Sequence, residues 1–295
     1  MSRFTVFEHE PLVLSRQPEV DDFFHLSPYV WKVEGTYHLA VRVQDPKTLD
    51  SFIAHGVGED GRRFEMARGA AIAPGSNPLE KNGCEDPTVV PLDDRCLVFY
   101  TGWNRETGIA KLMQAMGPTF DTLEKHGRVF PPDKRYAYTK EPSFVQGPDR
   151  CSMFFEYADG DLSRIGLACA GSMAGPWRFE DPLVIRRKEE WDLHHLSTGP
   201  VLYTPGERIT MFYNGSDEKA DWRIGWIEFD TNCRTVLRRG REPLIRRPPE
   251  PSGMPDIAFA ASVVVEGEDL WLYYSIGDQV VMRARLRETD PDAGE

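Results

Sequence analysis

The sequence contains no apolar run long enough to cross a bilayer. A membrane-spanning helix needs ~20 consecutive apolar residues, whereas the longest apolar stretch, Ile257–Val265, is much shorter and is interrupted by Ser262. The segment Met1–Leu12 has no apolar stretch of signal-peptide length, because Glu8 and Glu10 interrupt it. These absences predict a soluble, cytoplasmic protein.

Cysteine and basic residues are also scarce. Five cysteines in 295 residues, with no two spaced as C-x-x-C, are too few for a disulfide framework and argue against a zinc site. The 35 basic side chains are outnumbered by 47 acidic ones, which gives a formal net charge of −12. Because nucleic acids and anionic membranes attract basic surfaces, neither is expected as a partner. The adjacent pair His194-His195 would point to opposite faces of a strand, so no metal or other cofactor is predicted.

Glycine, proline and aromatic residues, in contrast, occur throughout the chain. There are 25 glycines and 23 prolines, and aromatic residues make up 11% of the sequence. Many aromatics stand in short apolar runs such as Val98-Phe99-Tyr100 and Leu272-Tyr273-Tyr274. Short apolar runs between turn residues are typical of β-strands, and long stretches with helical periodicity are lacking. The composition therefore predicts an all-β fold.

Five segments of the chain align on one another without gaps. Each has a short apolar stretch, a turn and an apolar strand, and four of them share a proline at the second position. The repeats start at residues 27, 86, 141, 199 and 260, so the steps between them are 59, 55, 58 and 61 residues. Repeats of this length predict a five-bladed β-propeller, with residues 1–295 forming a single domain. The alternative is a β-sandwich whose segments resemble one another by chance.

Residues at equivalent repeat positions are expected to converge on one pocket, because the first strand of each propeller blade lines the central channel. The first position holds Ser27, Asp86, Glu141, Gly199 and Ala260, and the last holds Arg42, Thr101, Glu156, Asn214 and Ser275. Several carboxylates at one pocket suit glycosidic cleavage, in which one acid protonates the leaving oxygen and another carboxylate activates water or attacks the anomeric carbon. The alternative role for Asp86 and Glu141 is to cap turns before proline.

Short motifs along the chain share one family pattern. Gly83–Pro87 reads G-C-E-D-P, Trp191–Pro200 reads W-D-L-H-H-L-S-T-G-P, and Tyr213-Asn214-Gly215 follows the fourth repeat strand. Together with Pro255–Phe259 and Tyr273–Asp278, these segments resemble the motifs of glycoside hydrolase family 130, the mannoside phosphorylases and β-mannosidases. The resemblance spans roughly residues 20–285 and implies a five-bladed propeller, in agreement with the repeat.

The resemblance also implies roles for individual residues. It makes Asp86 the general acid and assigns contacts with the sugar to Arg42 and Asp278. It also places Lys140 and His195 in the pocket. The other candidates for substrate binding come from their motif, their place in the repeat or their aromatic type: Ser27, Trp103, Tyr213 and Asn214. Trp103 is a candidate for stacking against a sugar ring, as is Trp222, although aromatic residues also fill the space between blades.

Two departures from the family pattern favour hydrolysis over phosphorolysis. The phosphorylases that the chain resembles have an arginine after the D-P pair and another in an H-R pair, whereas this chain has Thr88 and Phe155-Glu156. Phosphate binding needs converging cations. The sequence therefore predicts an inverting hydrolase that cleaves β-linked mannosides, with Glu156 or Glu141 as the base. A mannosyl phosphorylase that uses inorganic phosphate is the alternative.

A function of another class is also compatible with a propeller. The protein could be a non-catalytic scaffold or a carbohydrate-binding module. In a scaffold the ring positions would form ion pairs, for example between Arg42 and Glu156, and no pocket would surround Asp86. Arabinan- and fructan-cleaving enzymes with five blades share the carboxylate arrangement but lack this combination of motifs. The expected ligand is a mannoside or oligosaccharide, and the sequence leaves the oligomeric state open.

Overall fold

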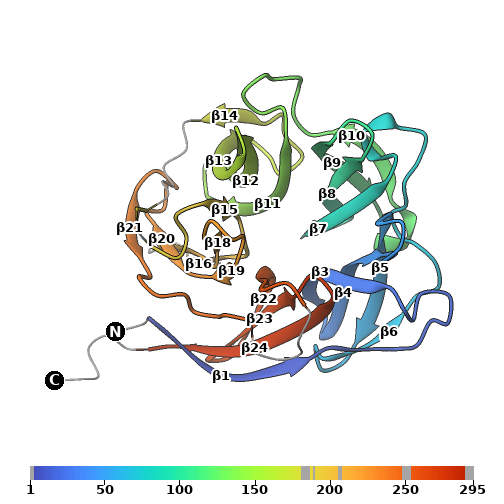
Figure 1. The fold of residues 1–295 in the computed structure, drawn as a ribbon, viewed down its shortest axis with the longest axis horizontal. Helices are drawn as coiled ribbons and strands as arrows, with labels where there is room; N and C mark the ends of the chain where they lie inside the picture. Colours follow the sequence, from blue (N-terminus) through green and yellow to red (C-terminus); the bar gives the residue numbers. More distant parts are fainter. Residues whose placement is uncertain (1–2, 181–186, 189, 205–207, 248–253, 290–295) are drawn as a thin grey trace.

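The computed structural model describes residues 3–180, 187–188, 190–204, 208–247 and 254–289. These residues form β-strands joined by turns and two short 3-10 helices, η1 (Pro78–Glu80) and η2 (Phe120–Thr122), with no α-helix among them. Antiparallel sheets are arranged around a common centre, as in a β-propeller (Figure 1). The prediction of an all-β fold is therefore confirmed. Nothing helical in the described ranges has the length and hydrophobicity needed to span a bilayer.

The first two repeats are hydrogen-bonded into one nine-stranded sheet. One antiparallel meander contains β3 (Phe24–Val33), β4 (Thr36–Gln44), β5 (Ser51–Gly58) and β6 (Arg63–Met66), with β2 (Val13–Leu14) parallel to β6. The second contains β7 (Gly83–Pro91), β8 (Cys96–Asn104), β9 (Ile109–Gly117) and β10 (Glu124–Arg128). A single parallel pairing, between Ser51 and Gly83, joins the two meanders. The repeat in the sequence did not indicate this junction, because it lies between repeats.

The third repeat forms a four-stranded sheet of β11 (Thr139–Gln146), β12 (Cys151–Asp159), β13 (Leu162–Ala170) and β14 (Arg178–Glu180). The fourth is divided into two smaller sheets. One contains β15 (His195–Ser197), β18 (Asn214–Ser216) and β19 (Trp222–Ile224), and the other contains β16 (Val201–Thr204), β17 (Arg208–Met211), β20 (Ile227–Phe229) and β21 (Val236–Arg239). The division coincides with Pro200, which has no N–H to donate to a ladder.

The last sheet contains both the first and the last strands of the described chain. It is formed by β22 (Ala258–Glu266), β23 (Asp269–Ile276), β24 (Val280–Glu288) and β1 (Phe4–Pro11). Strand β1 pairs antiparallel with β24, so that Phe4 lies opposite Glu288 and Pro11 lies opposite Met282. The ring of sheets is thereby closed by segments from opposite ends of the sequence (Figure 1).

The aromatic runs seen in the sequence fill the space between neighbouring sheets. The largest fully buried side chains include Phe99, Tyr100, Phe154, Tyr273 and Tyr274. Each such side chain stabilises the fold by about 1.5–3 kcal/mol through removal from water. Packing between sheets therefore fixes the inner strands around the centre, where the predicted site residues lie.

Candidate active site

A pocket of about 540 Å³ lies at the inner ends of the sheets. Seven of the eleven predicted site residues line it: Ser27, Arg42, Asp86, Trp103, Lys140, Glu141 and Asp278. Residues that are about 60 positions apart in the sequence, such as Ser27 and Asp86, therefore meet in one cavity, as the repeat predicted. A protein pocket of this size is suited to a small ligand.

Three of these residues are turned into the pocket by irregularities at the same place in the repeat. The antiparallel register shifts between Leu26 and Tyr29 in β3, and it shifts in the same way in β7 and β11. Ser27, Asp86 and Glu141 have positive φ angles of 49°, 48° and 51° within these shifts. Such bulges re-aim side chains, and non-glycine residues keep a left-handed conformation only where the surroundings impose it.

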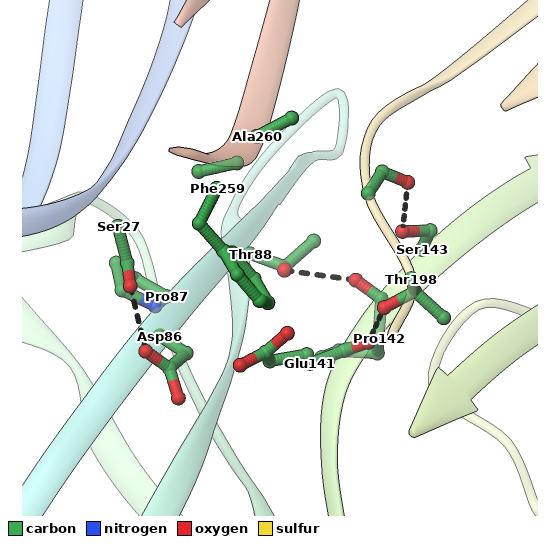
Figure 2. A pocket seen from close by; sticks show the side chains of 12 residues that line it. Ser27, Asp86, Pro87, Thr88, Glu141, Pro142, Ser143, Thr198, Phe259 and Ala260 are labelled. Carbon is green, nitrogen blue, oxygen red and sulfur yellow. Dashed lines mark hydrogen bonds between the residues drawn. The ribbon is translucent and has the colours of Figure 1, made fainter. Parts of the chain in front are cut away.

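Asp86 is buried and is held by two neighbours. The Ser27 hydroxyl donates a hydrogen bond of 2.6 Å to Asp86 Oδ1, and Arg42 Nη1 lies 3.6 Å from the same oxygen. Figure 2 shows Asp86 on the β7 side of the central space, with its carboxylate toward Ser27, and Glu141 on the β11 side. Both carboxylates line the same pocket.

Glu85 also belongs to this site, although it was not among the predicted residues. Its Oε1 lies 2.8 Å from Arg42 Nη2 and accepts a hydrogen bond of 2.7 Å from Ser51. Burial raises the pKa of Glu85, although Arg42 opposes this shift. Burial would lower the pKa of Arg42, but Glu85 and the other carboxylates outweigh it and hold that pKa above its usual value. The G-C-E-D-P motif contained the signal for Glu85, next to Asp86.

Asp278 adds another carboxylate to the pocket from the turn between β23 and β24. It has a positive φ of 52°, so its backbone, like that of Asp86, is held in a left-handed conformation. Burial raises the pKa of Asp278, whereas the charges of Arg42 and Lys140 lower it.

Lys140 is the second cation of the pocket and lies between two glutamates. Its Nζ is 3.3 Å from Glu141 Oε1 and 3.5 Å from Glu156 Oε1. Burial would lower the pKa of Lys140, but the two carboxylates raise it well above its usual value. Burial raises the pKa of Glu141 to about 8, Lys140 opposes the shift, and the charges of Glu156 and Asp86 increase it.

The raised pKa of Glu141 predicts how stability depends on pH. Between pH 4.5, the ordinary pKa of a glutamate, and about pH 8, Glu141 in the folded protein keeps a proton that the unfolded chain has released. The free energy of unfolding therefore falls as pH rises through this range. Glu141→Gln removes this titration. We expect the variant to lose less stability than the wild type between pH 5 and pH 8, measured by thermal unfolding. The exposed Glu124→Gln serves as control, and parallel curves for Glu141→Gln and wild type would contradict the pKa assignment.

Glu156, the other predicted base, lies beside the pocket without lining it. It is 4% exposed and stands on β12 directly opposite Lys140 of β11. In the described part of the chain, its Oε2 atom is buried and has no hydrogen-bond partner. A buried carboxylate oxygen needs a hydrogen-bond donor, and a water molecule can supply one.

His195 also does not line the pocket, but it contacts a residue that does. Its ring stacks on Trp222, with centroids 5.7 Å apart and an interplanar angle of 19°. The Ser163 backbone N–H donates to His195 Nδ1 at 3.0 Å, which leaves the proton of the neutral ring on Nε2. Burial, together with the neighbouring His194 and Arg164, lowers the pKa of His195. His195 is therefore a neutral donor near neutral pH.

Tyr213 and Asn214 lie outside the pocket, contrary to the prediction that they bind substrate. Tyr213 is fully buried, and its hydroxyl donates to Asp192. Asn214 is also fully buried, accepts a hydrogen bond of 2.7 Å from the backbone N–H of Ala260, and donates to Thr198. Both side chains are thus used in buried hydrogen bonds within the fold, and Tyr138, Trp222 and Phe259 line the pocket instead.

Side chains at the inner ends of the strands connect one repeat to the next. Donors in one repeat bond a backbone carbonyl of the following repeat: Thr88 to Pro142 (3.0 Å), Ser143 to Gly199 (2.6 Å), Asn214 to Ala260 (3.1 Å) and Ser262 to Pro28 (2.8 Å). Some of these bonds are visible in Figure 2. Thr88, where the family pattern has arginine, therefore supports the fold. The inner cavity that these residues surround has only about 30 Å³, enough for a water molecule but not for a sugar.

A metal centre is not evident at this site. Within the described ranges, no group of three or more His, Cys, Asp or Glu side chains is arranged to hold a metal ion. The charged groups of the pocket instead form the paired sets Arg42 with Glu85 and Asp86, and Lys140 with Glu141 and Glu156.

The chain matches the model of a known protein family. Residues 27–290 match the family model of glycoside hydrolase family 130, described as beta-1,4-mannooligosaccharide phosphorylase. Among curated proteins, the beta-1,2-mannobiose phosphorylase of Listeria innocua is 25% identical over 84% of this chain and 67% of its own length. The 1,2-beta-oligomannan phosphorylase of Thermoanaerobacter sp. is 21% identical over 87% of both chains.

Solved structures show the same fold. The beta-1,2-mannobiose phosphorylase of Listeria innocua, determined in complex with beta-1,2-mannobiose, has a TM-score of 0.79 at 17% identity, with 97% of both chains covered. A second solved structure has a TM-score of 0.77 at 21% identity. Its description states that the GH130 family of mannoside phosphorylases contains glycoside hydrolases that target beta-1,2 mannosidic linkages in Candida mannan. That match covers 89% of this chain and 84% of the other.

Proposed function

Because the chain belongs to glycoside hydrolase family 130, we propose that it is an enzyme that cleaves β-linked mannosides, with Asp86 as the proton donor. The observation that carries the proposal is the position of Asp86, which a bulge turns into a 540 Å³ pocket that Glu141 also lines. The open, charged pocket favours an enzyme over a scaffold. The names of the curated relatives support a mannoside as the substrate.

The proposed reaction inverts the configuration at the anomeric carbon. Ser27 and Arg42 both contact Oδ1 of Asp86, so the transferable proton is assigned to Oδ2. This proton passes to the glycosidic oxygen as the bond between that oxygen and the anomeric carbon breaks. An acceptor attacks the same carbon from the opposite face of the sugar ring. Arg42, Glu85 and Asp278 bind the sugar hydroxyls and orient the ring.

Phosphate is the acceptor that the comparisons favour. Both curated relatives are named phosphorylases, so the prediction of hydrolysis over phosphorolysis is not supported. Phosphate carries its own nucleophilic oxygen and needs no general base. In this reaction Lys140, which lines the pocket, would hold the phosphate on the far side of the sugar from Asp86. Phosphorolysis is therefore our first proposal.

One observation favours water as a second candidate. Arg42 and Lys140 are each already paired with two carboxylates, which reduces their attraction for another anion. Thr88, in place of an arginine, donates to the carbonyl of Pro142. In hydrolysis, Glu156 or Glu141 would take the proton of the attacking water. The unpartnered Oε2 of Glu156 is suited to that role.

Phosphate dependence distinguishes the two acceptors. We expect phosphate to increase the rate of cleavage of β-1,2- or β-1,4-linked mannobiose at least tenfold, with release of α-mannose 1-phosphate. NMR spectroscopy of the reaction identifies the released anomer. Free α-mannose formed at the same rate with and without phosphate would instead support the hydrolase. Asp86→Asn is the control for contaminating activity. Absence of cleavage under both conditions would contradict the proposed function as a whole.

We also propose that the sheets group into five blades. The meanders β3–β6 and β7–β10 share only the pairing of Ser51 with Gly83, and the two small sheets of the fourth repeat meet at Pro200. The side-chain bonds between successive repeats support the same grouping. A single domain over residues 1–295, which include some outside the described ranges, is part of this proposal, and the cytoplasmic location stays a prediction.

A further inference from the structure

Two buried carboxylates outside the pocket have no part in the proposed reaction. Glu80 is 1% exposed and Asp192 is 0% exposed. Glu80 ends η1, six residues before Asp86, and Asp192 lies three residues before His195. A charged group is costly to bury unless cations and hydrogen-bond donors surround it. The partners of these two carboxylates therefore indicate what the burial achieves.

The Glu80 carboxylate joins η1 to three strands of the second meander. Its Oε2 atom accepts a hydrogen bond of 2.7 Å from the hydroxyl of Tyr100 in β8, and its Oε1 atom accepts one of 2.6 Å from Lys125 in β10. The Cys84 thiol of β7 donates to Oε2 at 3.9 Å. A Cβ atom at Gly102 of β8 would lie 3.2 Å from the Cβ of Glu80, so η1 packs closely against this sheet.

This network lies directly behind the strands that carry the general acid. Glu85 of β7 is paired with Thr101 of β8, and both residues line the pocket. Successive side chains of a strand point to opposite faces. The residue before each of them, Cys84 or Tyr100, therefore points away from the pocket, where it contacts Glu80. Glu80 supports the back of the strand pair whose front forms the pocket wall.

The fourth repeat contains an equivalent network. Tyr213 stands at the repeat position of Tyr100, immediately before the last residue of the repeat. Its hydroxyl donates to the buried Asp192, which also accepts a hydrogen bond of 2.6 Å from Arg239. Arg239 in β21 and Lys125 in β10 both belong to the outermost strand of their repeat. In both repeats, a tyrosine and a cation thus hold a buried carboxylate that precedes the inner strands.

From this geometry we propose that Glu80 is a positioning residue for acid catalysis, which holds the start of β7 so that Asp86 keeps its place in the pocket. The inference rests on the proposed function, in which Asp86 is the proton donor. Only Lys81 and Asn82 separate Glu80 from β7. Asp86 has a positive φ, a conformation that its surroundings must impose. The fourth repeat has Gly199 at the position of Asp86, so its network provides an internal comparison.

Two conservative variants and two substrates test the role of Glu80. Tyr100→Phe removes one hydroxyl from the network, and Glu80→Gln removes the charge at nearly constant size. A β-linked mannobiose needs a proton for its leaving group, whereas β-mannosyl fluoride does not. We expect each variant to lower kcat for mannobiose about 5- to 50-fold with little change in KM, because a misplacement of ~1 Å can cost ~100-fold. The kcat for the fluoride should stay within about twofold of wild type.

Tyr213→Phe is the matched control, because it removes the equivalent hydroxyl from the network of Asp192. Both tyrosine variants should lower the melting temperature, but only Tyr100→Phe should change the ratio of the kcat values for the two substrates. Equal losses on both substrates, unchanged kcat on mannobiose, or the same change of ratio in Tyr213→Phe would overturn the inference. If Glu80→Gln does not fold, Tyr100→Phe alone decides.

A structural measurement separates this inference from the proposed function. If the wild type cleaves neither substrate, the proposed function fails, and crystal structures of the wild type and the two tyrosine variants decide the positioning of Asp86. Displacement of the Asp86 carboxylate in Tyr100→Phe, but not in Tyr213→Phe, supports the positioning role. A carboxylate that stays in place in Tyr100→Phe overturns it.

Discussion

Replacing Asp86 with asparagine is expected to reduce kcat for a β-linked mannobiose by about 10²- to 10⁴-fold, the usual contribution of a general acid. Asparagine has nearly the same shape and can still accept the hydrogen bond from Ser27 that Asp86 accepts at 2.6 Å. The variant should therefore fold and bind substrate normally while lacking the proton for the leaving oxygen. Initial rates with saturating mannobiose, together with thermal unfolding, measure both effects.

A substrate whose leaving group needs no proton distinguishes loss of acid catalysis from disruption of the active site. Fluoride departs without protonation, so Asp86→Asn should retain activity on β-mannosyl fluoride to within about tenfold. Equal losses on both substrates would indicate that Asp86 has another role, and unchanged kcat on mannobiose would exclude it as the acid.

Replacing Lys140 with methionine is expected to have the largest effect on stability. The substitution removes the cation that lies 3.3 Å from Glu141 and 3.5 Å from Glu156, and thereby leaves both carboxyl groups without a nearby cation. Removing one member of a buried pair costs about 3–5 kcal/mol. At about 2–4 °C per kcal/mol for a chain of this size, the melting temperature should fall by about 10 °C.

The pH dependence of this loss identifies its cause. A protonated carboxyl needs no cation, so the stability deficit of Lys140→Met should be smaller at pH 5 than at pH 8. Adding Glu141→Gln should restore part of the stability. The control is Lys81→Met, which breaks an exposed pair with Glu106 and should cost less than about 1 kcal/mol. Similar losses for the two lysine variants would show that the buried pairing contributes little.

The repeat in the sequence predicted the general fold because each segment contains the same strand pattern. It also placed Ser27, Asp86 and Glu141 in one pocket, because equivalent positions of repeated sheets converge. The boundaries between sheets were not predictable in this way. The pairing of Ser51 with Gly83 depends on how two meanders meet, and no pattern within a strand encodes that contact.

The predictions for Tyr213 and Asn214 depended on a family motif, and a motif specifies neighbours in sequence but not the direction of a side chain. The Asn214 side chain hydrogen-bonds the backbone of Thr198 and Ala260, and the Tyr213 hydroxyl donates to the buried Asp192. Trp103 and Trp222, the two candidates for stacking against a sugar ring, both line the pocket. The sequence left open whether they fill space between blades, because aromatic type alone does not distinguish a pocket wall from a core.

The pairing of β1 with β24 has a consequence for the order of events during translation. Phe4 is synthesised before its partner Glu288, which is added 284 residues later. At about 5–20 residues per second, the N-terminal strand waits roughly 15–60 s for its partner. During that time the other sheets can form, and the apolar face of β1 stays exposed to chaperones and to other nascent chains. The pairing of β1 with β24 therefore cannot form before Glu288 is synthesised, so protein synthesis sets the earliest time for this step of folding.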